Sequence, residues 1–160
     1  MCTAFISFRE NKSFPVIIAL NRDEFHYRNT ERASLWKESN IIAGRDLKSG
    51  GTWFGYDQEK RFALLTNLRS LKDIPVNRIS RGLIIPRLLK DCDSFENSES
   101  FLAENFKDVR NFNLLFGDLS VGLYFFSSSG GFRSVSKGIH FLSNASLDTP
   151  WPKVKDGEEM

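Results

Sequence analysis

Hydrophobic and polar positions divide the chain into two strand-forming halves with a helical segment between them. Short apolar or alternating runs, bounded by glycine, asparagine, aspartate or charged residues, predict strands at residues 2–8, 14–20, 41–43, 52–56 and 61–66. After a polar connection over residues 68–79, the apolar spacing becomes helical. It predicts one helix from Ser80, with Pro86 in or just after its first turn, and a second helix over residues 94–106. Strands return at residues 112–118, 122–127, 132–135 and 139–143.

The first two predicted strands form a hairpin, because only a short polar segment separates them. The hairpin would bring the end of the second strand back beside Cys2. Beyond that end lies the tetrad Asn21-Arg22-Asp23-Glu24. Asn21 and Asp23, two positions apart, would project from the same face of a continued strand, and Arg22 would face the other way.

The order of strands, two helices and strands again predicts an α+β fold. Two antiparallel sheets packed face to face, with a helical layer outside one of them, is the simplest arrangement. The length of 160 residues allows a single domain, residues 1–160, with a substantial core. Residues 25–40 follow neither period and are predicted to form a loop along one side of a pocket.

Charge and composition exclude several classes of protein. The 22 basic and 20 acidic residues are spread through the chain and leave a net charge of +2, so no basic face for nucleic acid is expected. No apolar run approaches the ~20 residues that cross a bilayer, and charged residues from Arg9 to Lys12 interrupt any signal peptide. The two cysteines do not suggest a disulfide framework, which favours a reducing, cytoplasmic location.

Cys2 is the first candidate for chemistry. If Met1 is removed, a thiol and an α-amine share one residue, and their ordinary pKa values of roughly 8.5 and roughly 8 let the amine accept the thiol proton at neutral pH. This pairing is the N-terminal form of nucleophilic catalysis, in which Asp23 would hold the ammonium group or orient the thiol. The alternative is that Cys2 is a small buried hydrophobe and that the tetrad is a solvated strand exit.

Asn67 and the glycine-rich stretch offer further candidates. Asn67 ends a predicted strand, where a backbone amide or carboxamide can donate to a developing oxyanion, a contribution of ~3 kcal/mol for one donor. An asparagine there can equally turn the chain. Gly50-Gly51 permits close backbone approach, but a strand follows it, so it is not a phosphate-binding P-loop. Trp53 and Phe54 would point to opposite faces, and one of them is expected in the core.

Five motifs in order connect the chain with a known family. They are Met1-Cys2-Thr3; Asn21-Arg22-Asp23-Glu24; Gly44-Arg45-Asp46 followed by Gly50-Gly51-Thr52-Trp53-Phe54-Gly55; Thr66-Asn67; and Leu142-Ser143-Asn144-Ala145 with Asp148-Thr149-Pro150-Trp151-Pro152-Lys153. In this order they resemble the NRDE family, which includes the transport and Golgi organization protein 2 homologues. That family is in turn similar to the choloylglycine hydrolase and penicillin V acylase group of N-terminal-nucleophile hydrolases.

The resemblance implies an αββα sandwich of two antiparallel sheets and a set of site residues. Cys2 is the implied nucleophile, Asp23 orients its amine, and Asn67 with Asn144 form the oxyanion hole. Asn144 also suits a turn after the last strand, and both roles are compatible. The candidate substrate-binding residues are Asn21, Arg22 and Trp53.

Two departures from the hydrolase pattern are visible. The hydrolases place an arginine three residues before the site aspartate, where this chain has Leu20. Family members also continue through further helices and a late Gly-Thr-Arg motif, so the domain is expected to be incomplete at its C-terminal end. An exposed sheet face would then be open to an interface, such as that of a homodimer.

The predicted function is a cysteine N-terminal-nucleophile amidohydrolase or acyltransferase that acts on a small amide or thioester without a metal or organic cofactor. The alternative is a non-catalytic protein of the transport and Golgi organization protein 2 type, which would handle haem or acyl-CoA lipids in the same pocket. A haem would need an axial ligand. The candidates are His26, His140 and the two cysteines, and none lies in a recognisable haem motif.

Overall fold

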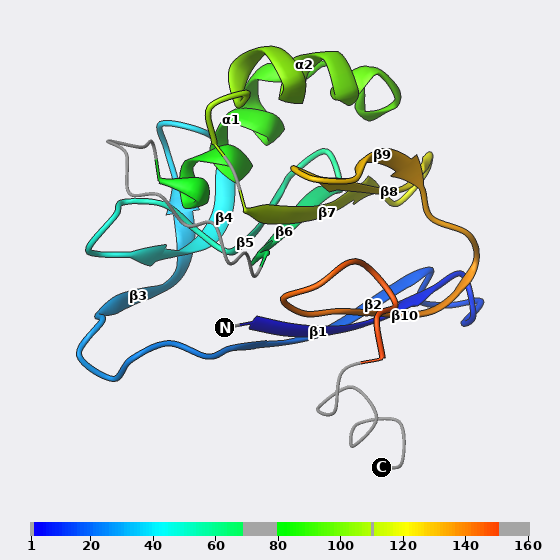
Figure 1. Cartoon of the computed structure of the whole chain (residues 1–160), viewed down its shortest axis with the longest axis horizontal. Coiled ribbons are helices and arrows are strands. Elements are labelled where there is room, and N and C mark those ends of the chain that lie inside the picture. Colours follow the sequence, from blue (N-terminus) through cyan, green and yellow to red (C-terminus); the bar gives the residue numbers. More distant parts are fainter. Residues whose placement is uncertain (1, 69–79, 110, 151–160) are drawn as a thin grey trace.

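The computed structural model describes residues 2–68, 80–109 and 111–150, and it confirms an α+β fold with two antiparallel sheets. Figure 1 shows three layers, with the helices above a larger sheet and a smaller sheet below it. Most of the predicted connection at 68–79, Met1 and the chain after Pro150 lie outside the described residues. The strands are β1 (Cys2–Phe8), β2 (Val16–Arg22), β3 (Thr30–Trp36), β4 (Ile41–Asp46), β5 (Phe54–Asp57), β6 (Arg61–Asn67), β7 (Phe112–Asp118), β8 (Gly122–Ser127), β9 (Gly131–Ser134) and β10 (Gly138–Leu142).

The smaller sheet has the order β10-β1-β2 and contains the predicted hairpin. Its second strand begins two residues later than predicted, because the turn is longer. The Asn11 side chain accepts hydrogen bonds from the amides of Ser13 and Phe14, and the Arg9 amide donates to the Pro15 carbonyl at 2.6 Å. The strand therefore continues through Arg22 and brings the tetrad into the sheet.

The larger sheet joins the remaining seven strands in sequence order, from β3 to β9. Its edge strand β3 contradicts the prediction of a loop over residues 25–40. The period-2 signal is missing because six of its seven residues are exposed and because a bulge between Glu31 and Ser34 shifts the register with β4. Pairing with β4, and not burial, defines this strand.

Two hydrophobic clusters lie on opposite faces of the larger sheet. The central strand β7 supplies both, since Leu114 and Phe116 face the helices and Leu115 faces the smaller sheet. A strand buried on both faces reads as a continuous apolar run, which is the pattern of β7 in the sequence. The cluster between the sheets fixes their separation and so positions the strand ends.

The helices are α1 (Ile84–Asp91) and α2 (Ser98–Asn105), each preceded by a 3-10 turn, η1 (Arg81–Leu83) and η2 (Phe95–Asn97). They correspond to the two predicted helices. Pro86 is tolerated in the first turn of α1, because amide groups there have no partner within the helix. Within the described part of the chain, no helix is both long and apolar enough to span a bilayer.

Candidate functional site

The inner face of the smaller sheet changes from apolar to polar at one end. Cys2 pairs directly with Arg22, and the row before it pairs Ala4 with Leu20. Paired residues of an antiparallel sheet project from the same face, so Cys2 and Arg22 both point toward the larger sheet. The structure therefore corrects the expectation that Arg22 turns away from the site.

The face of the larger sheet that packs against the smaller sheet also changes from apolar to polar at this end. Thr66 pairs with Asn113, which pairs in turn with Ser127. All three are buried, at 0%, 0% and 5% exposure, directly after the apolar row that includes Leu64 and Leu115. A buried polar layer thus lies between the sheets near Cys2. Buried polar groups normally have hydrogen-bond partners, but the side-chain oxygen of Asn113 has none among the described residues.

The loop after β10 joins the two polar rows. The Asn144 side-chain amide donates to the Asn67 carbonyl at 2.7 Å, and the Ser143 hydroxyl donates to the Cys2 carbonyl at 3.1 Å. Asn113 donates to the Ala145 carbonyl at 2.6 Å. The structure thereby brings the ends of three strands together, β1 at Cys2, β6 at Asn67 and β10 just before Asn144.

The Cys2 thiol is partly buried and carries opposing influences. Burial raises the pKa of Cys2 above its ordinary value. The positive charges of the α-amine and of Arg22 lower the pKa, the negative charge of Asp23 raises it, and a hydrogen bond from the Asp23 backbone amide lowers it. Burial prevails, so the sulfur is protonated at neutral pH in this arrangement. A base would be needed to generate the thiolate.

Asp23 lies beside Cys2, and Asn21 supports it. The Asn21 side chain donates a hydrogen bond to the Asp23 carboxylate, in keeping with the expectation that the two share a face. Asn21 pairs with Thr3, the residue next to Cys2, so it projects from the opposite face of the sheet, and it is exposed. It therefore lies on the outer face and reaches the site only through Asp23.

Arg22 is held by Asp46, a residue that the sequence reasoning passed over. The Arg22 guanidinium contacts the Asp46 carboxylate at 2.7 Å and lies 4.5 Å from the centre of the Trp53 ring. Arg28 donates to the same carboxylate oxygen at 2.6 Å. The Gly-Arg-Asp motif was the available signal, because an aspartate followed by serine and glycines is typical of a turn built on its side chain.

The other oxygen of Asp46 accepts the backbone amides of Lys48 and Ser49, both at 3.0 Å. Burial alone would raise the pKa of Asp46, but the hydrogen bonds from Arg28 and Ser49 and the charges of Arg28 and Arg22 hold that pKa below its ordinary value. Asp46 therefore stays ionised and fixes both arginines.

Two glycines of the same motif are explained by close approach. A β-carbon on Gly51 would lie 2.4 Å from the backbone of Gly82 in η1, and Thr52 donates to the Gly82 carbonyl at 2.9 Å. A β-carbon on Gly44 would lie 3.0 Å from the Trp53 indole. The glycines let the turn pack against the helical layer and let the Trp53 indole approach the backbone of β4 closely.

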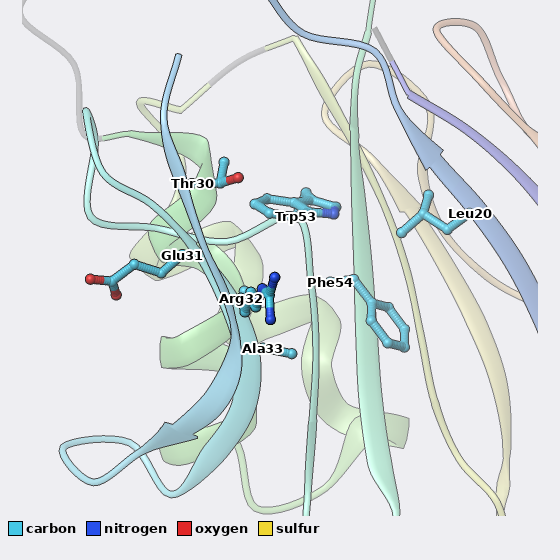
Figure 2. Close-up of a pocket in the computed structure, with 8 residues that line it drawn as sticks. Leu20, Thr30, Glu31, Arg32, Ala33, Trp53 and Phe54 are labelled. Atoms are coloured by element: carbon cyan, nitrogen blue, oxygen red, sulfur yellow. The ribbon is translucent and has the colours of Figure 1, made fainter. Parts of the chain in front are cut away.

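A pocket of ≈ 350 Å³ opens beside Trp53. Figure 2 shows Leu20 of β2 facing Trp53 and Phe54, with the bulged strand β3 forming the opposite wall. Trp53 and Phe54 both border this pocket, although adjacent strand residues would point to opposite faces. Trp53 precedes β5, so its side chain does not follow the alternation of faces along that strand. The Trp53 pocket is lined by Leu20, Thr30, Glu31, Arg32, Ala33, Gly44, Trp53 and Phe54.

His140, a candidate haem ligand, has a structural environment. Its ring nitrogens lie 2.9 Å from the Asp148 carboxylate and 2.9 Å from the Ser136 carbonyl. Asp148 also accepts the Phe141 amide, so these contacts brace the loop that carries Asn144. Among the residues that the structure describes, no group of three or more metal-binding side chains is present.

Comparison with known proteins identifies the family. The sequence profile of Transport and Golgi organisation 2 matches residues 1–160, which confirms the resemblance to the NRDE family, another name for the same family. A "Transport and Golgi organization protein 2 homolog" of Bos taurus is 32% identical, and that of Homo sapiens 30%, each over all of this chain and 63% of its own length. A Drosophila melanogaster protein, "Transport and Golgi organization protein 2", is 30% identical over 59% of this chain and 43% of its own length. The chain thus spans less than two thirds of these relatives, and it belongs to the Transport and Golgi organisation 2 family.

Proposed function

We propose that this chain carries the centre of a cysteine N-terminal-nucleophile amidohydrolase or acyltransferase that acts on a small amide or thioester. The observation that carries the proposal is the convergence of Cys2, Arg22 and Asn144 at one end of the inter-sheet layer, next to an apolar pocket. Removal of Met1 is part of the proposal, since it gives Cys2 a free α-amine.

The reaction begins with transfer of the Cys2 thiol proton to that amine. The sulfur then attacks the substrate carbonyl carbon, a C–S bond forms, and the carbonyl electrons move onto oxygen. When the tetrahedral intermediate collapses, the bond to the leaving nitrogen or sulfur breaks, and the ammonium group supplies its proton. Water hydrolyses the acyl-cysteine to release a carboxylic acid and restore the thiol, or another nucleophile accepts the acyl group.

The raised pKa of Cys2 supports a built-in base over a standing thiolate. Burial keeps the thiol protonated, and the ordinary amine pKa of roughly 8 suits proton exchange with it near neutral pH. Asp23 is the proposed partner of the amine, because its charge already acts on Cys2 and its carboxylate is held by Asn21.

Asn144 is the proposed oxyanion donor, together with Asn67. The Asn144 amide group already donates toward the end of β6 at 2.7 Å. An amide nitrogen carries two hydrogens, so it can hold that contact and donate to a substrate oxygen as well. One such donor contributes ~3 kcal/mol to transition-state stabilisation.

The alternative is a binding protein that uses the same pocket without catalysis, which the mostly apolar lining favours. An acyl group suits this lining better than haem does, because no histidine, cysteine or methionine that could be an axial ligand is among the lining residues that the structure describes. We propose a reducing, cytoplasmic location for the enzyme and for the binding protein alike, since both cysteines are free thiols. Homodimerisation stays a prediction, which sedimentation would test.

The test is the intact mass of the purified protein before and after a thiol-directed acylating probe. We expect a mass without Met1 and one acyl adduct, which is lost in Cys2→Ala and kept in Cys92→Ala. Cys92 is the matched control because it is 5% exposed and its thiol bonds the Ser94 carbonyl. Retention of Met1, or labelling of Cys2 no faster than free cysteine, would favour the binding protein.

A further inference from the structure

The Trp53 pocket exists because the backbone of two strands makes room for it. In β3 the bulge between Glu31 and Ser34 leaves Arg32 and Ala33 out of register with β4, and a bulged strand bends away from its partner. In β4, Gly44 has no side chain to displace the indole, which would otherwise meet a β-carbon at 3.0 Å. These features keep a wall open that regular strands would close.

The chemistry of the pocket favours an apolar group. Leu20 of β2 and the adjacent residues Trp53 and Phe54 line it with apolar side chains from two segments of the chain, as Figure 2 shows. Charged side chains enter only from the exposed strand β3, at Glu31 and Arg32. The volume of ≈ 350 Å³ lies near the lower end of the roughly 300–1,000 Å³ range of small-molecule sites. A short aliphatic chain or a single ring suits it, and a polypeptide segment does not.

The pocket adjoins the candidate nucleophile. Leu20 pairs with Ala4, which places it diagonally from Cys2 on the same inner face, at about 7–8 Å for such diagonal neighbours. Arg22 is paired with Cys2 and its guanidinium lies over the Trp53 ring, so it links Cys2 with one wall of the pocket. A ligand with its carbonyl at the Cys2 sulfur can therefore extend past Arg22 to the indole.

From this arrangement we infer that the Trp53 pocket binds the apolar end of the acyl group that Cys2 receives. The inference rests on the proposed acyl transfer and narrows its substrates to amides or thioesters of short hydrophobic acids. The leaving amine or thiol remains outside the pocket. Burial of each methylene gains ~0.8 kcal/mol, about a fourfold change in rate or affinity.

The experiment measures adduct formation at Cys2 with S-ethyl thioesters of acetic, butyric and hexanoic acid, by intact mass. We expect the rate constant to rise about fourfold per methylene. Ala33→Leu fills the pocket from an exposed position and should abolish that rise while the acetyl probe still reacts. Ala19→Leu is the matched control, because Ala19 is exposed on the outer face of β2, and it should keep the rise. Thermal melting checks that both variants are folded.

Binding to Cys2→Ala separates the two proposals, with quenching of indole fluorescence as the readout and Trp53→Phe in the same background as the control. If Cys2 reacts equally with all three thioesters, the pocket inference is wrong and the nucleophile stands. If no adduct forms, but Cys2→Ala binds the hexanoyl thioester more tightly than the acetyl one and Ala33→Leu removes the difference, the pocket stands without the chemistry. Absence of chain-length preference in both assays overturns the inference.

Discussion

The side-chain amide of Asn144 donates a hydrogen bond to the backbone carbonyl of Asn67 at 2.7 Å, across 77 positions of sequence. Asn144 is 3% exposed and follows the last strand of the smaller sheet, whereas Asn67 ends a strand of the larger one. The contact closes the inter-sheet layer beside Cys2. It fixes the position of a carboxamide that the proposed chemistry requires.

Asn144→Ala should slow acylation of Cys2 by about 10²–10³-fold if the carboxamide stabilises the oxyanion. The rate constant is obtained by quenching the labelling reaction at successive times and measuring the intact mass. Ser143→Ala is the neighbouring control, since it removes the hydrogen bond to the Cys2 carbonyl and a longer 3.5 Å contact to the Asn144 side-chain oxygen but keeps the Asn144 amide donor. A rate within about threefold of the parent, in a folded variant, would assign Asn144 a structural role alone.

Asn113→Leu should lower the free energy of unfolding by about 1–3 kcal/mol. The change leaves the half-buried Ala145 carbonyl without its 2.6 Å donor. Urea denaturation measures the loss. Asn105→Leu, at an exposed position of α2, is the control and should have little effect. Equal stability of the two variants would mean that the Asn113 contact does not hold the Asn144 loop.

Asp46→Asn should destabilise the protein by about 2 kcal/mol at pH 7, since charged hydrogen bonds to Arg22 and Arg28 are lost. The folded pKa of Asp46 is depressed, so its contribution is complete above the unfolded value of 3.8 and disappears as the pH falls through the folded pKa. The stability difference between parent and variant should therefore shrink below about pH 3.8.

Chemical denaturation at a series of pH values measures this difference. Glu38→Gln is the control, because the Glu38 pKa is also lowered by its partner Arg45 but the pair is exposed to solvent, and no measurable change in stability is expected. A difference that stays constant down to pH 2 would contradict the role given to the ionised Asp46.

Gly51→Ala should cost about 3 kcal/mol, because its β-carbon would lie 2.4 Å from the backbone of Gly82, which no side-chain rotation relieves. Gly50→Ala should cost only about 1 kcal/mol. Gly50 has φ +70° but nothing within 4 Å of an added β-carbon. Thermal unfolding of the pair tests the contact, and a larger loss at Gly50 would contradict it.

The pH profile of Cys2 labelling should depend on Met1. With Met1 in place, the buried thiol has a raised pKa, so the rate should still increase above pH 9. With Met1 removed, the amine of Cys2 serves as base, and the rate should level off near its pKa of roughly 8. Identical profiles for the two forms would contradict a base within the same residue.

Most of the local structure follows from the sequence. Compact apolar runs and turn residues predicted nine of the ten strands and both helices, because these signals act between neighbouring residues. The hairpin from β1 to β2 also followed from its short loop, and with it the approach of the tetrad to Cys2. The resemblance to the N-terminal-nucleophile hydrolases indicated Asn67 and Asn144 as oxyanion donors, and that role stays a prediction.

Only the tertiary structure decided what these residues contact. β3 is a strand because it pairs with the edge of β4. A bulged, exposed strand has no alternating hydrophobic pattern in the sequence. Arg22 pairs with Cys2 because the connection between β1 and β2 is two residues longer than predicted, and it is then held by Asp46 from the other sheet. The Asn144–Asn67 link and the Trp53 pocket depend on sheet packing across many residues, which local hydrophobic patterns do not encode.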